Sequence, residues 1–277
     1  MAIITSAANQ RLKQLRQALR AAHADPQGSL PIEGAKLIQE AINSRLLIEE
    51  IFVAQSRRQE PMVERLLAQV KSPSTEVVEV ADRAFPSISD VESPQGLLAL
   101  ARLPKFELNE LLKDDPLLLV GFELQDPGNL GTLLRSAEAF GGRAVLLTRK
   151  SVSPLNAKVV RASAGSIFRV PCLSRLEIPL LIDALTQHGF RLLATTPRAT
   201  VDFRKATYGG KVALLIGNEA RGLDSEILHR VHTRIRIPMD GKVESLNASI
   251  ATSIILCEAA RQRALPSGDC RLPTEPA

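Results

Sequence analysis

The stretch Leu117-Leu118-Leu119-Val120 decides the fold, because four consecutive apolar residues are typical of a strand that is buried on both faces. A helical pattern over about 130–140 follows this run. Further apolar runs alternate with helical stretches, at 144–147, 191–194, 212–216 and 235–237. This alternation is typical of a parallel α/β sheet with helices on both faces. We therefore predict a parallel-sheet domain over 116–265, closed by a long helix at about 246–264 and followed by a tail at 266–277.

A shorter α/β alternation precedes this domain. We expect a first helix, capped by Ser6, that carries Leu12, Leu15 and Leu19 at helical spacing. Helices are then expected at about 34–43 and 62–70, and extended segments at 30–32, 48–53, 77–80 and 96–101. The charged segment 104–115, between two prolines, has the composition of a linker. The first 103 residues are therefore predicted to form a small α/β domain of their own.

The composition excludes several classes of protein. With 277 residues, of which 45% are hydrophobic and 23% charged, the chain is large enough for two ordinary cores and is not generally disordered. It has eight Phe, one Tyr and no Trp, which argues against a surface that stacks RNA bases. The three cysteines show no CxxC spacing, so neither a disulfide framework nor a cysteine zinc site is expected.

The start of the chain does not have the pattern of a secretion signal. Arg11, Lys13 and Arg16 interrupt any apolar core there, and no stretch reaches the roughly 20 apolar residues of a membrane span. We therefore expect a cytoplasmic protein without a membrane partner.

The net charge of +5 is unevenly distributed along the chain. The first 103 residues hold 12 basic and 12 acidic residues, whereas 141–175 holds seven basic residues and no acidic one. Basic surfaces of this kind suit contacts to RNA phosphates, although solvated faces are the alternative. The candidate RNA-binding residues are Arg11, Lys13, Arg16, Arg143, Lys158 and Arg161.

Polar residues are concentrated in three segments at or after the ends of predicted strands, where α/β sheets bind their ligands. The first runs from Asp126 to Arg135, and in it Asn129 could simply cap the next helix. The second, 214–223, passes from a buried strand through Gly217 into Asn218 and Glu219. Glycine lets a ligand approach the backbone closely, and a carboxylate near buried backbone needs hydrogen-bond donors. In the third segment, 235–249, an ordinary helix cap is again an alternative role for its polar residues.

Signatures of other chemistries are missing from the sequence. There is no GxxxxGK[ST] phosphate loop, no GxGxxG after the strand at 117–120, and no HExxH or GxSxG. P-loop ATPases, ordinary dinucleotide enzymes, metal catalysis and serine hydrolases are therefore disfavoured.

Taken in order, the segments 129–135, 216–222 and 237–247 resemble the three motifs of the SpoU/TrmH family of RNA ribose 2'-O-methyltransferases. The resemblance covers about 117–263, and the first part of the chain resembles the family's RNA-substrate-binding domain. It implies a SPOUT fold with a C-terminal trefoil knot, S-adenosylmethionine as methyl donor, an RNA substrate and a homodimer. The resemblance implies neither DNA as a substrate nor a bound metal ion.

The resemblance also implies roles for individual residues. Those expected to contact S-adenosylmethionine are Thr195, Gly217, Ile237, Met239 and Leu246. Arg135 matches the motif arginine that is associated with activation of the ribose hydroxyl. Because a guanidinium group is a poor base, orientation of the hydroxyl and its phosphate is the favoured role, with proton removal left open. The residues expected to assist Arg135 are Asn129, Glu219, Ser245 and Asn247.

Two further questions stay open at this point. Ribosomal RNA is favoured over transfer RNA as the substrate, because relatives with an extra N-terminal domain commonly act there. A non-catalytic RNA-binding or ribosome-assembly protein with the same fold is the alternative from another class, and a nucleotide-linked oxidoreductase lacks its glycine fingerprint.

Overall fold

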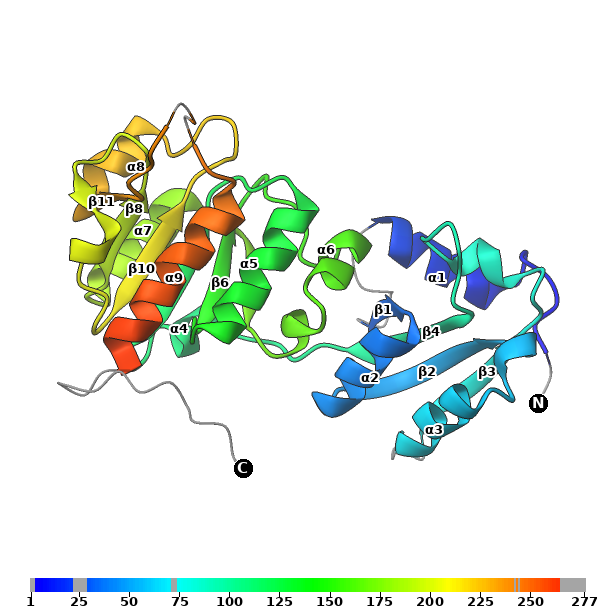
Figure 1. The fold of residues 1–277 in the computed structure, drawn as a ribbon. Helices are drawn as coiled ribbons and strands as arrows, with labels where there is room; N and C mark the ends of the chain where they lie inside the picture. The colour runs from blue at the N-terminus through cyan, green and yellow to red at the C-terminus, as the bar shows by residue number, and fades with distance from the viewer. Residues whose placement is uncertain (1–2, 22–28, 71–73, 242, 244, 265–277) are drawn as a thin grey trace. The chain divides into compact units, whose positions relative to one another are not determined.

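The computed structural model describes residues 3–21, 29–70, 74–241, 243 and 245–264 (Figure 1). The predicted tail at 266–277 lies outside these residues. The chain forms two compact units, which we describe separately. The first comprises 1–105 together with 153–169, and the second comprises 106–152 and 170–277.

The first unit is built on a four-stranded mixed sheet in the order β1-β4-β2-β3. Its strands are β1 (Ser29–Glu33), β2 (Leu47–Ala54), β3 (Glu76–Val80) and β4 (Leu97–Arg102). β4 runs antiparallel to both neighbours, and β2 runs parallel to β3. The helices of this unit are α1 (Gln10–Ala21), α2 (Ala35–Asn43), α3 (Pro61–Gln69) and α6 (Ala157–Ala162), with 3-10 turns η1 (Gln55–Arg57), η2 (Phe85–Ile88) and η3 (Ser166–Phe168).

The first helix begins later than the sequence predicts. Ser6 Oγ accepts from the N–H of Ala8, but α1 starts at Gln10 and its first turn is held by Asn9, whose Oδ1 accepts from Arg11 N at 2.9 Å. The prediction that Ser6 caps this helix is therefore wrong. Leu12 and Leu15 are buried against Phe52, Phe85 and their neighbours, as their helical spacing predicts.

The second unit is built on a seven-stranded sheet in the order β7-β6-β5-β10-β8-β11-β9. All of its strand pairs are parallel, which confirms the predicted sheet type. The strands are β5 (Leu117–Gly121), β6 (Ala144–Thr148), β7 (Cys172–Leu176), β8 (Arg191–Thr195), β9 (Val201–Asp202), β10 (Val212–Ile216) and β11 (Thr233–Arg236). The edge strands β7 and β9 were not predicted, because they are partly exposed and lack a continuous apolar run.

Helices cover both faces of this sheet. Alternate side chains of the central strands, such as Leu118 and Val120, share one core with Leu181, Ile182 and Leu185 of the helix α7. On the other face, α5 and α9 pack side by side (Figure 1). The helices of this unit are α4 (Leu108–Leu111), α5 (Pro127–Ala139), α7 (Ile178–Gln187), α8 (Ser225–Arg230) and α9 (Ala248–Ala264), with the 3-10 turn η4 (Phe203–Lys205).

The segment 104–115, which has linker composition, contains α4 and contributes to the core of the second unit. Leu111 and Leu112 are 3% and 0% exposed and belong to the same core as Leu118. Charged residues dominate the composition of this segment, and its two buried leucines alone do not make a recognisable periodic pattern.

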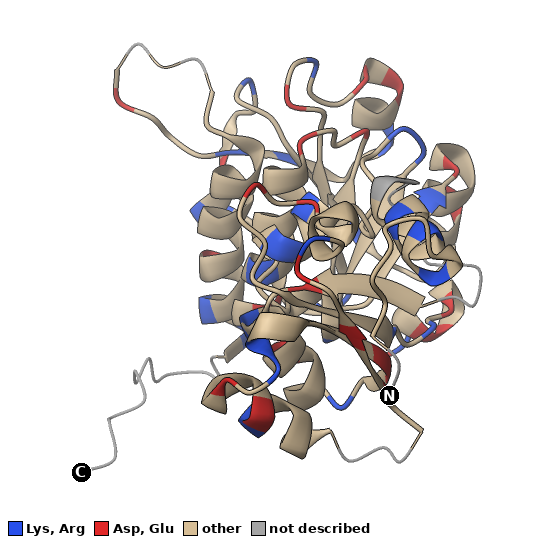
Figure 2. Cartoon of the chain, turned by 90° about the vertical axis from the view of Figure 1, so that its right-hand side faces the viewer, with Lys and Arg blue, Asp and Glu red and all other residues tan. Residues whose placement is uncertain are grey.

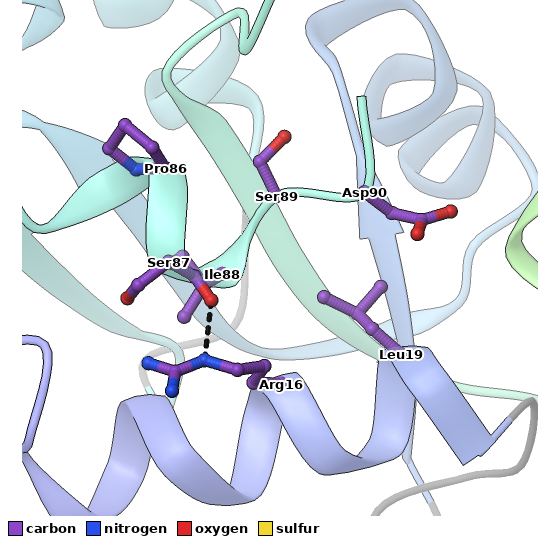
Figure 3. Close-up of a pocket in the computed structure, with 7 residues that line it drawn as sticks. All are labelled: Arg16, Leu19, Pro86, Ser87, Ile88, Ser89 and Asp90. Carbon is purple, nitrogen blue, oxygen red and sulfur yellow. Dashed lines mark hydrogen bonds between the residues drawn. The ribbon is translucent and has the colours of Figure 1, made fainter. Parts of the chain in front are cut away.

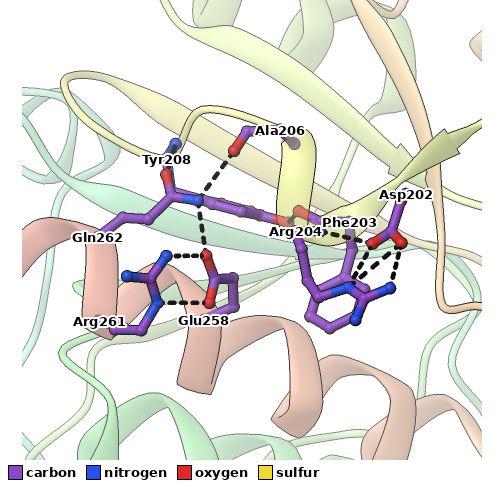
Figure 4. Close-up of polar contacts among 8 residues, drawn as sticks. All are labelled: Asp202, Phe203, Arg204, Ala206, Tyr208, Glu258, Arg261 and Gln262. Atoms are coloured by element: carbon purple, nitrogen blue, oxygen red, sulfur yellow. Dashed lines mark hydrogen bonds and ion pairs between the residues drawn. The ribbon is translucent and has the colours of Figure 1, made fainter.

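Polar contacts hold the last half of α9 to the segment 202–210 (Figure 4). Gln262 accepts from the N–H of Tyr208 at 3.1 Å and donates to the carbonyl of Ala206 at 3.0 Å. Tyr208 is fully buried, and its hydroxyl donates to the carbonyl of Phe203 at 2.9 Å. Arg263 donates to the carbonyls of Tyr208 and Gly210. These bonds satisfy backbone groups of a loop that would otherwise be partly buried without partners.

Among the described residues, no helix is both long enough and apolar enough to cross a membrane.

Candidate active site

The three polar segments meet at one edge of the second sheet. β5, β10, β8 and β11 are consecutive neighbours and run parallel, so their carboxyl ends lie side by side. The segment after β5 leads into α5, the segment after β10 contains Gly217 to Gly222, and the segment after β11 leads to α9. This edge is where open α/β sheets bind their ligands.

Asp126, not Asn129, caps the helix α5. Its Oδ1 accepts from Asn129 N at 2.7 Å, and the helix starts at Pro127, whose fixed φ and missing N–H suit that position. The interpretation of Asn129 as a cap is therefore wrong. Because Asp126 takes this role, the Asn129 side chain is available for contacts to other segments.

Asn129 joins the three segments through its side-chain amide. Its Nδ2 donates to Glu219 Oε1 at 3.1 Å, and its Oδ1 accepts from Asn247 Nδ2 at 2.8 Å. Ser249 Oγ lies 3.3 Å from the same Oδ1. The residue is only 8% exposed, so these partners replace water almost completely. One buried amide thus connects residues that are 90 and 118 positions away in the sequence.

Glu219 receives the donors that a carboxylate near buried backbone requires. Besides Asn129, the N–H groups of Gln125 and Asp126 point to its two oxygens at 3.3 and 3.2 Å. Burial by itself would raise the pKa of Glu219, but the hydrogen bonds from Asn129 and from the backbone outweigh burial and lower that pKa. Glu219 is therefore a fixed negative charge at neutral pH and a weak proton acceptor.

Gly217 and Asn218 give the segment after β10 its shape. A Cβ on Gly217 would lie 2.3 Å from the carbonyl carbon of Gly222 and 2.6 Å from Leu223 N. Glycine is needed here because the chain's own backbone comes close, whereas the sequence suggested close approach by a ligand. Asn218 Oδ1 accepts from the N–H groups of Ala220 and Arg221, at 3.0 and 3.1 Å, and fixes the following turn.

The residues expected to contact S-adenosylmethionine fall into two groups. Thr195 ends β8, and Gly217 and Ile237 directly follow β10 and β11, so all three lie at neighbouring strand ends. Thr195 Oγ1 donates to the carbonyl of Leu215 at 3.1 Å. Met239 and Leu246 lie in the segment between β11 and α9, exposed and half-buried respectively. No hydrogen bond or core cluster of the described residues joins these last two to the strand ends.

The third motif begins the helix α9. Asn247 Oδ1 accepts from Ser249 N at 2.9 Å and from Ile250 N at 3.3 Å, so Asn247 caps this helix while its amide reaches Asn129. Ser245 is exposed and precedes this cap. Ser249 was not singled out from the sequence, and its spacing of two residues after Asn247 is the local signal that marks it as a capping partner.

Arg135 lies two turns into α5 and is exposed. It lies six positions after Asn129, which places the two side chains on different sides of the helix. Within the described part of the chain, its guanidinium has no hydrogen bond or ion pair of its own. The structure therefore leaves this cation available to a ligand and does not join it to the Asn129 contacts.

Two of the three cations predicted on α1 already have partners in the first unit. Arg11 donates to both oxygens of Glu76, at 2.9 and 2.7 Å, and lies 2.8 Å from Glu50 Oε1. Arg16 donates to the carbonyls of Ser87 and Ala7, at 2.6 and 3.0 Å, beside a hollow of about 250 Å³ (Figure 3). Lys13 is exposed, and no ion pair involves it among the described residues.

The other predicted cations also differ in their partners. Arg161 pairs with Asp90 at 3.3 Å, whereas Arg143 and Lys158 are exposed without an ion pair in the described part of the chain. Lys and Arg are interspersed with Asp and Glu along the ribbon (Figure 2). Net charge per segment thus overstates the number of cations that are free to meet a phosphate.

Two known protein families match this chain, one over the parallel-sheet unit and one over the first unit. Residues 116–257 match the SpoU rRNA Methylase family, and residues 9–99 match the MRM3-like substrate binding domain. The chain belongs to the SpoU rRNA methylase family. The first match contains all three polar segments, and the second lies within the first structural unit.

Relatives in this family share most of the length of the chain. An uncharacterized tRNA/rRNA methyltransferase of Synechocystis is 33% identical over 95% of both chains. The 23S rRNA guanosine 2'-O-methyltransferase RlmP of Bacillus subtilis is 29% identical over 91% of this chain and 97% of its own.

Solved structures of the family have the same fold. A crystal structure of an RNA 2'-O ribose methyltransferase is 36% identical, with a TM-score of 0.80 over 95% of this chain and 100% of the other. An AdoMet-bound rRNA methyltransferase from Sinorhizobium meliloti is 29% identical, with a TM-score of 0.82 over 94% of this chain and 97% of its own.

Proposed function

We propose that this chain transfers the methyl group of S-adenosylmethionine to a ribose 2'-hydroxyl of ribosomal RNA. The observation that carries the proposal is the Asn129 amide, which binds Glu219 and Asn247 and so assembles the three family segments into one site. Relatives named as 23S rRNA 2'-O-methyltransferases support ribosomal RNA as the substrate, and transfer RNA is the alternative to test. For a protein that methylates ribosomal RNA, we expect a cytoplasmic location.

The residues expected to hold S-adenosylmethionine have side chains and backbone of a suitable kind. Ile237 and Leu246 are half-buried apolar groups, and Thr195 and Gly217 bring backbone to the edge of the sheet, which suits a nucleoside recognised by backbone between apolar walls. We expect these four residues and Met239 to hold the cofactor. Bound there, it supplies an electrophilic methyl group on a positively charged sulfur.

The chain's own residues then have to bring the hydroxyl to that methyl group. An oriented ribose hydroxyl would accept the methyl group that the cofactor supplies, and the hydroxyl proton would pass to solvent water. Arg135, whose guanidinium has no partner in the described part of the chain, binds the adjacent phosphate and orients the hydroxyl. Glu219, Asn129 and Asn247 fix the surrounding segments, and we expect the exposed Ser245, just before α9, to contact the ligand.

RNA binding is assigned to the cations whose side chains have neither a hydrogen bond nor an ion pair among the described residues. Lys13, Arg143 and Lys158 contact phosphates, whereas Arg11, Arg16 and Arg161 are first held by the partners described above. The assembly is a homodimer. Ile250 and Ile254, 52% and 37% exposed, lie one turn apart on α9 and provide an apolar stripe suited to a second copy of the chain. The trefoil knot stays a prediction.

Labelled methyl transfer tests the function. Purified protein is incubated with labelled S-adenosylmethionine and either unmodified ribosomal or transfer RNA, and the product is digested with alkali. Because a 2'-O-methyl group blocks cleavage at its own ribose, we expect label from ribosomal RNA in alkali-resistant dinucleotides. Arg135→Ala should lower the rate at least about 100-fold, whereas Arg230→Ala, at an exposed ion pair on α8, should not.

Label in alkali-sensitive mononucleotides would mean base methylation and contradict the proposal. RNA binding without any methyl transfer would favour the non-catalytic RNA-binding protein.

A further inference from the structure

Glu123, just after β5, has an unusual backbone conformation. Its φ is +48°, in the left-handed region that favours glycine and asparagine over a residue with a longer side chain. It stands between the strand end at Gly121 and the N–H groups of Gln125 and Asp126 that reach Glu219. A strained conformation at this point persists only if neighbouring groups hold it.

Both backbone polar groups of Glu123 are bonded to side chains from neighbouring strand ends. Its N–H donates to Thr148 Oγ1 at 3.0 Å, and its carbonyl accepts from Asn218 Nδ2 at 2.8 Å. Thr148 ends β6 and is 1% exposed, and Asn218 follows β10. The left-handed turn at Glu123 is thus fixed from both sides of β5.

The Glu123 carboxylate adds two charged contacts. It accepts from Arg221 Nη2 and lies 3.4 Å from Lys150 Nζ. Arg221 belongs to the turn 218–222 that carries Glu219, and its N–H is held by Asn218. The ion pair therefore joins the segment 122–126, which donates to Glu219, to the turn that presents Glu219.

We propose that Glu123 and Arg221 form a positioning pair, which clamps the segments 122–126 and 218–222 together and so sets the place of Glu219 and Asn129 for methyl transfer. This inference rests on the proposed function. It adds Glu123, which lies outside the three motif segments, and Arg221, which lies within 216–222 but has no role in the set of site residues expected from the sequence. Neither residue needs to touch RNA or cofactor for this role.

The pair acts on geometry more than on stability. The Arg221 side chain is 65% exposed and that of Glu123 is 18% exposed, and ion pairs at such positions contribute little to the stability of a fold. A small displacement of a catalytic group, in contrast, has a large effect on rate. Loss of turnover without loss of stability is therefore the signature of the pair.

A double-mutant cycle on the full-length protein tests this. We expect Glu123→Ala and Arg221→Ala each to lower kcat about tenfold, and the double variant to lose little more, because either change removes the same clamp. The dissociation constant for S-adenosylmethionine should stay within about twofold, since two backbone hydrogen bonds between Asn218 and Gly222 hold the turn after Gly217 separately. Thermal midpoints should change by less than about 3 °C.

The matched control is the ion pair between Asp183 and Arg230 in the same unit, with side chains 50% and 38% exposed. The same cycle there should leave kcat unchanged. Glu123→Gly, which relieves the backbone strain but removes the carboxylate, should resemble Glu123→Ala in kcat. Wild-type turnover in Glu123→Ala or Glu123→Gly, or losses that multiply in the double variant, would overturn the positioning pair. Multiplying losses would indicate that Arg221 binds RNA directly.

Hydrogen exchange tests independently of activity whether the ion pair of Glu123 and Arg221 holds the two segments together. Without the clamp, amide exchange over 122–126 and 218–222 should be at least about fivefold faster in Glu123→Ala, and unchanged in Asp183→Ala. Unchanged exchange in Glu123→Ala would also overturn the pair. If the wild type methylates no RNA, the proposed function fails, and the exchange result still decides whether the clamp exists.

Discussion

Asn129 in the second unit and Arg11 in the first are both polar side chains with several partners, but their partners differ in origin. Asn129 binds residues of two distant segments, Glu219 and Asn247, and all three lie within the region that matches the SpoU rRNA Methylase family. Arg11 binds Glu50 and Glu76, which belong to the sheet of its own unit. The first set of contacts assembles a site, whereas the second occupies a cation that RNA could otherwise bind.

The contrast distinguishes residues that hold other groups in place from residues that attract RNA by their charge. At the carboxyl edge of the parallel sheet, polar groups are fixed by one another, as a reaction that depends on orientation requires. Along α1, Lys13 is exposed and has no ion pair with any described residue, so it is the better candidate for phosphate contact. Sequence-independent RNA binding needs charge rather than exact placement.

The largest effect is expected from Asn129→Asp. This change replaces the donor to Glu219 by a second carboxylate in a site that is 8% exposed, so the three segments should separate. We expect methyl transfer to fall about 1,000-fold and the free energy of unfolding by about 2 kcal/mol. Rate assays and urea unfolding measure both effects, with Asn43→Asp on the exposed end of α2 as control. Retained activity would show that Asn129 does not hold the site together.

Gly217→Ala is expected to affect the reaction less than Asn129→Asp does, although it should destabilise the fold slightly more. The new Cβ would lie 2.3 Å from the carbonyl carbon of Gly222, so the turn must shift. We expect the free energy of unfolding to fall by about 3 kcal/mol and cofactor affinity by about tenfold. Gly209→Ala is the matched control, because no atom lies within 4 Å of a Cβ there. A stable Gly217→Ala variant that has lost only cofactor binding would instead support ligand approach as the reason for this glycine.

A still smaller effect concerns pH. The hydrogen bonds to Glu219 outweigh its burial and hold its pKa below the ordinary 4.5 in the folded chain. This group therefore stabilises the fold fully above that value, and its contribution is lost as the pH falls through the lowered pKa. The difference in unfolding free energy between the wild type and Glu219→Gln should be present at pH 7 and shrink on acidification. A difference that grows toward low pH would contradict the direction of the shift.

The smallest effects are expected from two of the cations of α1, Lys13 and Arg11. Lys13→Gln should lower the slope of log affinity for RNA against log salt by about one unit, with little change in stability. Arg11→Gln should leave this slope unchanged and lower the unfolding free energy by less than about 1 kcal/mol. Filter binding at several salt concentrations measures the slopes. A lower slope in Arg11→Gln would show that Arg11 leaves its carboxylates to bind RNA.

The predicted elements and the structure agree best where one face or both faces of an element are buried. The run 117–120 is β5, and the run 212–216 is β10 with every residue buried. Helix starts were less accurate: Asn9 replaces Ser6, and Asp126 replaces Asn129. The dipeptide Asp126-Pro127 carries a local start signal, since Pro suits the first helical position and Asp the cap before it.

The sequence alone determined the parallel sheet and the order of the three segments. Buried strands and amphipathic helices need apolar residues at regular positions, so their burial can be predicted from local sequence patterns. Only the tertiary structure decided what those segments do with one another. It made Asn129 a bridge rather than a cap, gave Gly217 the backbone of Gly222 as its neighbour, and paired Glu123 with Arg221. Contacts between residues about 90 positions or more apart depend on how strands are ordered in the sheet, and no local pattern encodes that order.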